Sequence, residues 1–165
     1  MNRDNHAGKI ESLSYIGGFF DGEGYVGLGL QRTHGGQDRN ILPSVRFSNT
    51  DIRPLEFIKE QLISLGIKCW ISSREGRRRT QRTKKGDYVK TIHDVGLSGK
   101  TQVKLFIELI RPYVLVKGDQ LDIVMQFILS REKAMAGRGG RQGKGRAEYS
   151  QEEIEMIDKI KALKH

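Results

Sequence analysis

The chain is 165 residues long, about the size of one ordinary domain, and its 36% of hydrophobic residues lie in short periodic blocks that can form one core. Its single cysteine, Cys69, excludes an internal disulfide and a zinc cluster built from cysteines. The polar start and the absence of a long apolar run argue against a signal peptide and a membrane span. We therefore expect an intracellular protein with no membrane partner, cytoplasmic in a prokaryote and organellar in a eukaryote.

Charge is the most informative bulk property. Lys and Arg number 29 against 20 Asp and Glu, which gives a net charge of +9. Such an excess is typical of proteins that bind polyanions, because cations that neutralise phosphates release the counterions condensed on nucleic acid. A basic protein that is merely soluble is the alternative, and the placement of the cations along the chain decides between the two.

Apolar periodicity predicts a helix, two strands, a helix, two strands and two further helices, in that order. The predicted elements are a helix at Ser12–Phe20, strands at Tyr25–Gln31 and Ser44–Asn49, a helix capped by Thr50 or Asp51 and ending at Leu65, strands at Ile67–Arg74 and Tyr88–Leu97, and helices at Ser98–Ile110 and Gly118–Arg131.

Three details of this pattern are testable in a structure. Pro43 argues that its strand is at an edge or only begins there. Ile92 is out of phase with its neighbours, which suggests a bulge in the fourth strand. Gly27 and Gly29 fall on the polar side of the first strand, where they mean loose packing, a bulge or close approach of the backbone to a ligand.

Four strands in two hairpins, with helices packed on one face, form an α+β layer whose other sheet face is open. We expect this domain to cover residues 1–131, followed by a basic Gly-rich linker at 132–149 and a C-terminal helix at 150–165. A capping box, Ser150 to Glu153, opens this last helix, with Ile154, Ile157 and Ile160 on one stripe. The helix could prop a dimer, act as a docking arm or cover the core.

Cations gather around the open face and its second hairpin. A solvated basic loop is the plain interpretation of the hairpin tip, but the outward strand residues can also read base edges, and a two-stranded ribbon fits the major groove. We favour nucleic-acid binding, with Gln31, Arg46 and Arg74 reading bases and the hairpin tip binding phosphates. The predicted contact residues are Gln31, Arg32, Arg39, Arg46, Ser48, Arg74, Arg77, Arg78, Arg79, Arg82, Lys84, Lys85, Lys90, Arg138 and Arg141.

A turn with two acids, Asp21 and Glu23, follows the first helix. Its match to G-x-G-x-x-G is coincidental, because a dinucleotide site needs a strand before a helix and the order here is reversed. Carboxylates and carbonyls at a helix C-terminus suit a hard cation such as Mg²⁺ or Mn²⁺, although a plain acidic turn is the alternative. A phosphate-binding surface beside an acidic metal turn is what phosphodiester hydrolysis requires.

The run from Ile16 to Gly24 resembles the LAGLIDADG motif, with glycine at its third and ninth positions and acids at its sixth and eighth. The segments Phe47–Asp51 and Pro112–Lys117 resemble later landmarks of that family, so the resemblance covers about Ser12–Arg131. It implies an αββαββα fold with a four-stranded antiparallel saddle sheet.

The resemblance also implies an activity and an assembly. Members of the family are homing endonucleases, so we expect Mg-dependent hydrolysis of both DNA strands and a coding element of the intron or stand-alone type. One motif per chain implies a homodimer on a long, nearly palindromic site. Its interface would include the motif-helix residues Tyr15, Gly17, Gly18 and Asp21.

By the same resemblance, Glu23 would bind the metal with the carbonyl of Gly22, and Asp21 would support the turn more than the chemistry. Asp51 would orient the attacking water or only cap its helix, and Lys117 would hydrogen-bond water or offset charge on the phosphate unless it is merely exposed. Gln120 is a weaker neighbour.

Two features depart from the family. Glu23 replaces an aspartate, and Leu55 stands where some members carry a basic residue, so either Arg53 substitutes or that contribution is missing.

Two other classes remain open at this stage. One is a nucleic-acid-binding protein on the same fold that does not cut, either an RNA-splicing maturase, with RNA as its partner, or a transcription regulator. The other is a basic structural protein of the ribosome-associated kind, which would bind nucleic acid without metal-dependent turnover.

Overall fold

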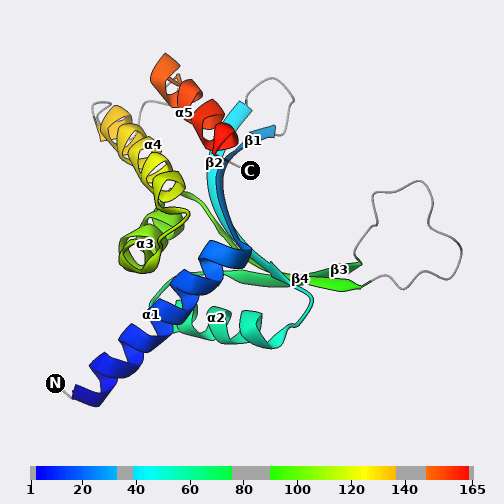
Figure 1. Ribbon diagram of the computed structural model, residues 1–165. Helices are drawn as coiled ribbons and strands as arrows, with labels where there is room; N and C mark the ends of the chain where they lie inside the picture. The colour runs from blue at the N-terminus through cyan, green and yellow to red at the C-terminus, as the bar shows by residue number, and fades with distance from the viewer. Residues whose placement is uncertain (1–2, 33–38, 76–89, 137–147, 164–165) are drawn as a thin grey trace, which may run out of the picture.

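The computed structural model describes residues 3–32, 39–75, 90–136 and 148–163. Helices cover one face of a curved sheet and leave its concave face free, which confirms the α+β prediction (Figure 1). The elements are α1 Arg3–Glu23, β1 Gly24–Arg32, β2 Arg39–Asn49, α2 Arg53–Ser64, β3 Trp70–Glu75, β4 Thr91–Ser98, α3 Lys100–Ile110, the 3₁₀ turn η1 Arg111–Tyr113, α4 Gly118–Ala136 and α5 Gln151–Ala162.

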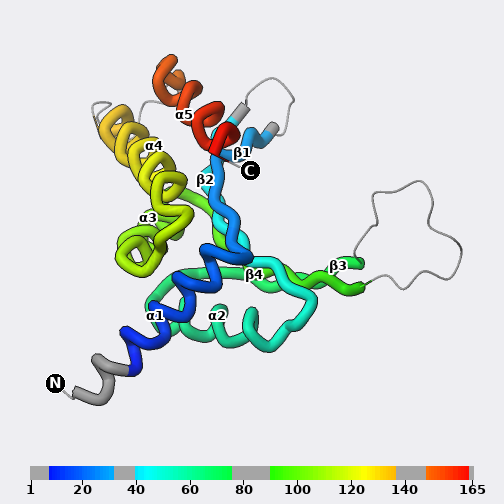
Figure 2. Tube along the Cα trace, viewed as in Figure 1, coloured from blue at the N-terminus to red at the C-terminus, as the bar shows by residue number. Residues whose placement is uncertain are grey.

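The sheet is antiparallel with the strand order β1-β2-β4-β3, so each hairpin contributes one central and one outer strand. Figure 2 shows that α1 leads directly into β1 and that the two hairpins diverge from the region where β2 and β4 pair. The four-stranded antiparallel saddle is therefore confirmed.

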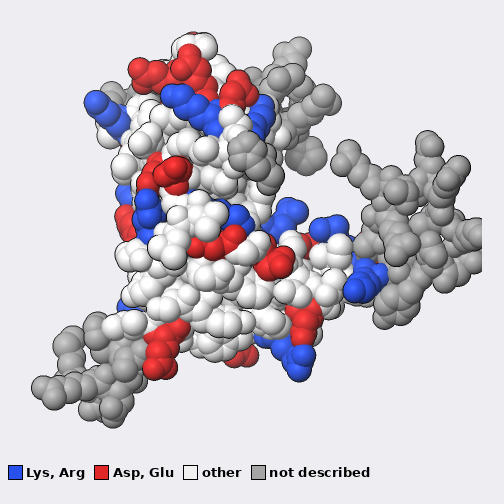
Figure 3. Space-filling model, in the orientation of Figure 1, with Lys and Arg blue, Asp and Glu red and all other residues white. Residues whose placement is uncertain are grey.

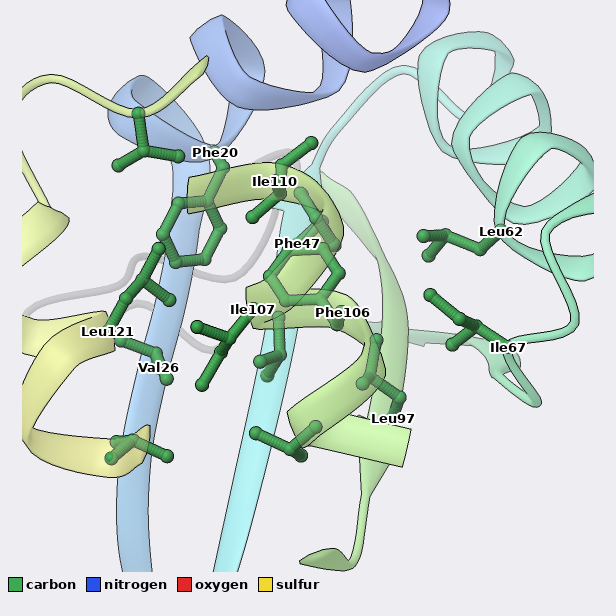
Figure 4. Close-up of a cluster of buried hydrophobic side chains, with 14 of the residues drawn as sticks. Phe20, Val26, Phe47, Leu62, Ile67, Leu97, Phe106, Ile107, Ile110 and Leu121 are labelled. Carbon is green, nitrogen blue, oxygen red and sulfur yellow. The ribbon is translucent and has the colours of Figure 1, made fainter. Parts of the chain in front are cut away.

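The core lies between the sheet and its helices (Figure 4). Strand alternation turns Val26, Val45 and Leu97 inward, and each is almost fully buried. At the centre, the rings of Phe20, Phe47 and Phe106 contact one another with centroids 5.6–5.9 Å apart, in edge-on arrangements that aromatic pairs favour. Because Phe20 lies in the last turn of α1, this cluster fixes the end of that helix against the sheet.

Two of the predicted elements, the first helix and the second strand, were too short. Helix α1 begins at Arg3 rather than Ser12, because its first turns lack the apolar periodicity from which the sequence start was read. Strand β2 begins at Arg39 rather than Ser44 and lies inside the sheet. It tolerates Pro43 because the carbonyl of Pro43 faces away from β1 and accepts the N–H of Gly99, so the missing proline N–H removes no bond to β1.

The predicted bulges are absent from the paired strand residues. Ile92 pairs in continuous register with Arg74 and faces the open side of the sheet, which explains its different phase. The register of β1 with β2 is also unbroken through Gly27 and Gly29.

The N-caps predicted for two helices, Ser98 for α3 and Thr50 or Asp51 for α2, were wrong. Gly99, with φ of 91°, precedes α3 in place of Ser98, and Ile52 precedes α2 in place of Thr50 or Asp51. Helix α2 ends at Ser64, one residue before the predicted end, and Gly66, with φ of 80°, follows its C-cap.

The C-terminal helix α5 covers the core, the third of the expected alternatives. Its capping box is confirmed, and Ile157 and Ile160 are buried, but Ile154 is 44% exposed. The buried position is taken by Glu153, whose carboxylate lies 3.1 Å from the guanidinium of Arg131 on α4.

Tyr149, just before α5, holds the β1–β2 hairpin. Its hydroxyl accepts the N–H of Ile41 at 2.9 Å and donates to the side chain of Asn40 at 2.8 Å. Among the described residues, no helix is both long and apolar enough to cross a membrane.

Candidate functional site

The turn that ends α1 is fixed by a carboxylate. Asp21 accepts the backbone N–H groups of Leu115, Val116 and Lys117 at 2.7, 3.1 and 3.0 Å. Burial raises the pKa of Asp21, but these three hydrogen bonds and the nearby Lys117 outweigh burial, so the pKa lies below its usual value. Asp21 thus stays charged and holds the segment that carries Lys117, as expected of a turn-supporting residue.

Lys117 reaches back across this turn. Its Nζ donates to the carbonyls of Phe20 at 2.9 Å and Gly24 at 2.6 Å, so it is not merely exposed. Burial lowers the pKa of Lys117 even though Asp21 and Glu23 act to raise it. An ammonium has three N–H groups, and these two bonds leave one for a water molecule or a phosphate.

Glu23 and Gly22 lie at the exposed surface of the same turn, close enough for the charge of Glu23 to act on Lys117. Their oxygen atoms are of the kind that Mg²⁺ prefers. No group of three or more His, Cys, Asp or Glu in the described parts of the chain could hold a metal ion. The oxygen atoms of Glu23 and Gly22 can therefore hold a hard cation only if a second chain or the ligand completes the coordination shell of the ion.

Asp51 interacts with a different basic residue, Arg53 at the start of α2. Its carboxylate accepts the backbone N–H of Arg53, the first residue of α2, at 3.0 Å and pairs with the Arg53 guanidinium. These hydrogen bonds lower the pKa of Asp51 to about 2. Asp51 thus supports the start of α2 although it is not the N-cap, and with Tyr15 and Phe57 it lines a hollow between α1 and α2.

Gln120 is placed elsewhere, because its side chain donates to the carbonyl of Leu163 at the end of α5, at 3.1 Å.

The two glycines of the motif have different surroundings. A Cβ on Gly17 would lie 2.5 Å from the carbonyl oxygen of Tyr113, so Gly17 serves the packing of α1 on η1 within the chain. The place of Gly17 in a dimer interface stays a prediction, which this contact within the chain does not test. Gly18 has nothing within 4 Å of its Cβ direction.

Exposed apolar side chains lie at two places along α1. Leu115 and Val116, 91% and 77% exposed, lie beside its last turn, where their backbone N–H groups bond to Asp21, and Tyr15 and Phe57, whose rings contact each other, lie further back. Exposed apolar groups of this kind are characteristic of an interaction site.

The open sheet face carries the predicted base-reading side chains. Gln31, Arg46, Arg74 and Lys90 are exposed, and Ser48 is half-buried. Figure 3 shows basic side chains along this concave side of the molecule. The structure therefore presents hydrogen-bonding groups on the face that the helices leave free.

Two residues of the open face were missed from the sequence. Trp70 lies flat over Gly96, where a side chain would collide with its ring, and the guanidinium of Arg46 is 6.0 Å from the centre of that ring. Asp94, only 3% exposed, accepts hydrogen bonds from Ser48 and Arg74. The alternation of β4 could have placed Asp94 outward, beside the cations, because residues two apart share a face.

Some predicted contact residues have no described side chain. Arg32 and Arg39 pair at the end of the β1–β2 ladder, but only their backbone is described. Others lie outside the described residues altogether: Arg77, Arg78, Arg79, Arg82, Lys84, Lys85, Arg138 and Arg141.

An αββαββ unit, with an acidic turn where its first helix enters the sheet and a free concave face, defines the fold of the LAGLIDADG endonucleases. The model of the LAGLIDADG-like domain matches residues 11–111, well over half of the chain. The chain therefore belongs to the LAGLIDADG family. A search of curated proteins found no match.

Solved structures agree on the fold. The homing endonuclease I-CvuI, in complex with the I-CreI target, has a TM-score of 0.54 at 16% identity, with 93% of this chain and 97% of that chain covered. The archaeal intron-encoded homing endonuclease I-Vdi141I, complexed with DNA, has a TM-score of 0.51 at 17% identity, with 93% and 99% covered. I-LtrWI, a LAGLIDADG homing endonuclease bound to target DNA, has a TM-score of 0.55 at 17% identity. The match covers 94% of this chain and 45% of that chain.

Proposed function

We propose that the chain is a site-specific double-strand DNA endonuclease that acts as a homodimer with Mg²⁺ or Mn²⁺ and works inside the cell, where its target DNA lies. The observation that carries this proposal is the α1 turn, in which Asp21 orders the backbone that delivers Lys117 beside the exposed Glu23. The turn adjoins β1 of a sheet whose concave face is free and basic. Phosphodiester hydrolysis needs both parts: a face lined with cations to hold the DNA and an acidic turn to hold the metal ion.

A second copy would complete the site. This chain spans nearly all of I-CvuI and I-Vdi141I but under half of I-LtrWI, whose length can hold two such units. The exposed apolar side chains of Tyr15, Phe57, Leu115 and Val116, and the open surface of Gly18, support an interface along α1. A twofold axis there would bring two Glu23 side chains together, one for each DNA strand.

Glu23 and the Gly22 carbonyl would hold the divalent ion, with remaining ligands from the partner copy and DNA. When bound, the ion supplies Lewis acidity and an activated water. Lys117, through its remaining N–H, would stabilise the charge that develops on the scissile phosphate. Asp51, with Arg53, is the proposed group for orienting water.

The concave face would lie in the major groove, each copy reading one half of a nearly palindromic site. Gln31, Arg46 and Arg74 are proposed to contact base edges, Ser48 and Lys90 to support them, and the cations of residues 76–89 to bind phosphates. Phosphate contacts would make binding strongly salt-dependent.

A plasmid tests the proposal directly. Its insert joins the two DNA flanks of the coding element, because a homing enzyme's gene interrupts its own recognition sequence. We expect linear product with Mg²⁺ and none with EDTA, and Glu23→Gln should bind the insert but leave it intact. The matched control, Glu152→Gln, changes an exposed glutamate on α5, away from the turn, and should cut normally. Binding without metal-dependent cutting by the native protein would instead favour the non-cleaving maturase or regulator.

A further inference from the structure

The open face of the sheet contains one buried carboxylate that the proposed chemistry does not use. Asp94 on β4 is 3% exposed. One of its oxygens accepts the hydroxyl of Ser48, and the other accepts Nε of Arg74 at 2.8 Å. The Arg74 side chain is 54% exposed, so its guanidinium is anchored along one edge and accessible along the rest.

A carboxylate at the position of Asp94 does not strengthen DNA binding. A carboxylate on a surface that meets DNA repels the phosphates, and burial of a charge is costly unless the charge is paired. Burial raises the pKa of Asp94, but the hydrogen bonds from Ser48 and Arg74 outweigh it and lower the pKa, so the group is charged at neutral pH. A role in orienting its partners explains the residue better than a contribution to binding strength.

The hydrogen-bond geometry limits what Arg74 can do. With Nε bonded to Asp94, the donors left as a pair are the two terminal nitrogens of the guanidinium. Two parallel donors of this kind match O6 and N7 of guanine in the major groove. Because the arginine is already held, less side-chain entropy is lost when it binds.

We propose that Asp94 is a positioning residue that holds Arg74 end-on for guanine, so that each copy selects guanine at one position of its half-site. This inference rests on the proposed function, since it requires the concave face to bind duplex DNA. It adds the base that is read and the residue that enforces the reading. Ser48, which donates to the other oxygen of Asp94, completes the support from β2.

The test is selection from a duplex library with a randomised segment, using the full chain. Arg74→Ala identifies the guanine that Arg74 reads. Asp94→Asn presents one acceptor where two donors now bond, and should reduce the preference for that guanine about tenfold while other positions keep theirs. Affinity for random duplex should not fall, because a negative charge is removed. Asp158→Asn, an exposed aspartate on α5, is the matched control and should select as the native protein does.

Two results would overturn the inference: an Asp94→Asn protein with the native guanine preference, or one that loses affinity for all sequences equally. If Asp94→Asn does not fold, Ser48→Ala decides, because it removes the other donor that holds Asp94 and leaves Arg74 unchanged. It should reduce the preference for the same guanine, and a Ser48→Ala protein with the native preference would overturn the inference. A native protein that enriches no duplex at all would instead refute the proposed function.

Discussion

Two regions of this molecule use a carboxylate in different ways. At the end of α1, the carboxylate of Asp21 accepts backbone N–H groups, and the ammonium of Lys117 donates to two backbone carbonyls. On the concave face, Asp94 bonds to the side chains of Ser48 and Arg74. In the turn, each of these side chains is therefore anchored to backbone groups that every residue possesses, whereas on the face the side chains anchor one another.

This difference separates the two proposed tasks. A turn held through backbone atoms can keep one chemistry while neighbouring side chains vary, which suits strand cutting. A face held through side-chain pairs can change its base preference without disturbing the core, because its residues point away from the helices. Substitutions in the turn should thus affect cutting rather than reading, and those on the face should do the reverse.

After the loss of cutting expected for Glu23→Gln, the largest effect is expected at Lys117. Lys117→Met keeps most of the aliphatic stem but removes the ammonium that bonds to Phe20 and Gly24. We expect the cutting rate at saturating protein to fall about 100-fold, because a preorganised charge near the phosphate is lost. Plasmid linearisation measures the rate, and library selection should return the native preferences. Lys133→Met, at an exposed position of α4, is the control. An equal loss of cutting rate and of base selection would contradict the division of tasks between the turn and the concave face.

The next effect concerns the paired glycines. Gly17→Ala would place a Cβ against the carbonyl of Tyr113 and should reduce the free energy of unfolding by about 2 kcal/mol. Gly18→Ala meets nothing within the chain and should stabilise the isolated fold by up to about 1 kcal/mol.

Denaturant unfolding measures both changes, and sedimentation measures assembly. We expect Gly18→Ala to weaken the dimer while Gly17→Ala weakens the fold. A Gly18→Ala protein that is fully dimeric would place the interface elsewhere.

Arg46 offers a smaller effect on the concave face. Arg46→Ala removes a guanidinium held near the ring of Trp70 and should weaken binding to the target insert about tenfold. Titration with labelled duplex, in Ca²⁺ to prevent turnover, measures the affinity. The cutting rate at saturating protein should stay within a few-fold of the native rate. A large loss of that rate would mean that the face also takes part in the chemistry.

The smallest effect depends on pH. The pKa of Asp21 is lower in the folded state than in the unfolded chain, so its stabilisation is present above the unfolded value and is lost as pH falls through the folded one. Asp21→Asn should therefore cost about 1 kcal/mol at pH 7 and progressively less below about pH 4. Thermal unfolding across this range measures the difference. A difference that does not change with pH would show that the charge of Asp21 is unimportant.

Much of the fold could be predicted because its signals are local. Period-two alternation identifies β1 and β2, the capping box opens α5, and Gly66 ends α2. The acidic turn could be found from its own residues. Lys117 could be found only through the resemblance, because it is far from the turn in the chain and meets it through Asp21.

What the sequence could not provide depends on packing between distant segments. Glu153 was predicted only as part of a capping box, yet it also forms a buried ion pair with Arg131. The close approach of Tyr113 to Gly17 joins segments that are far apart in the chain, so it could not be predicted either. Asp94 was overlooked because an acid among cations has no evident role until its hydrogen bonds to Arg74 and Ser48 are known.

A mixed dimer tests the central claim most directly. One copy is native, and the other carries Glu23→Gln, with different affinity tags so that only the mixed species is purified. If each Glu23 serves one strand, the mixed dimer should convert supercoiled target plasmid to the nicked circle and form little linear product. Linear product at the native rate, or no cutting at all, would contradict the account.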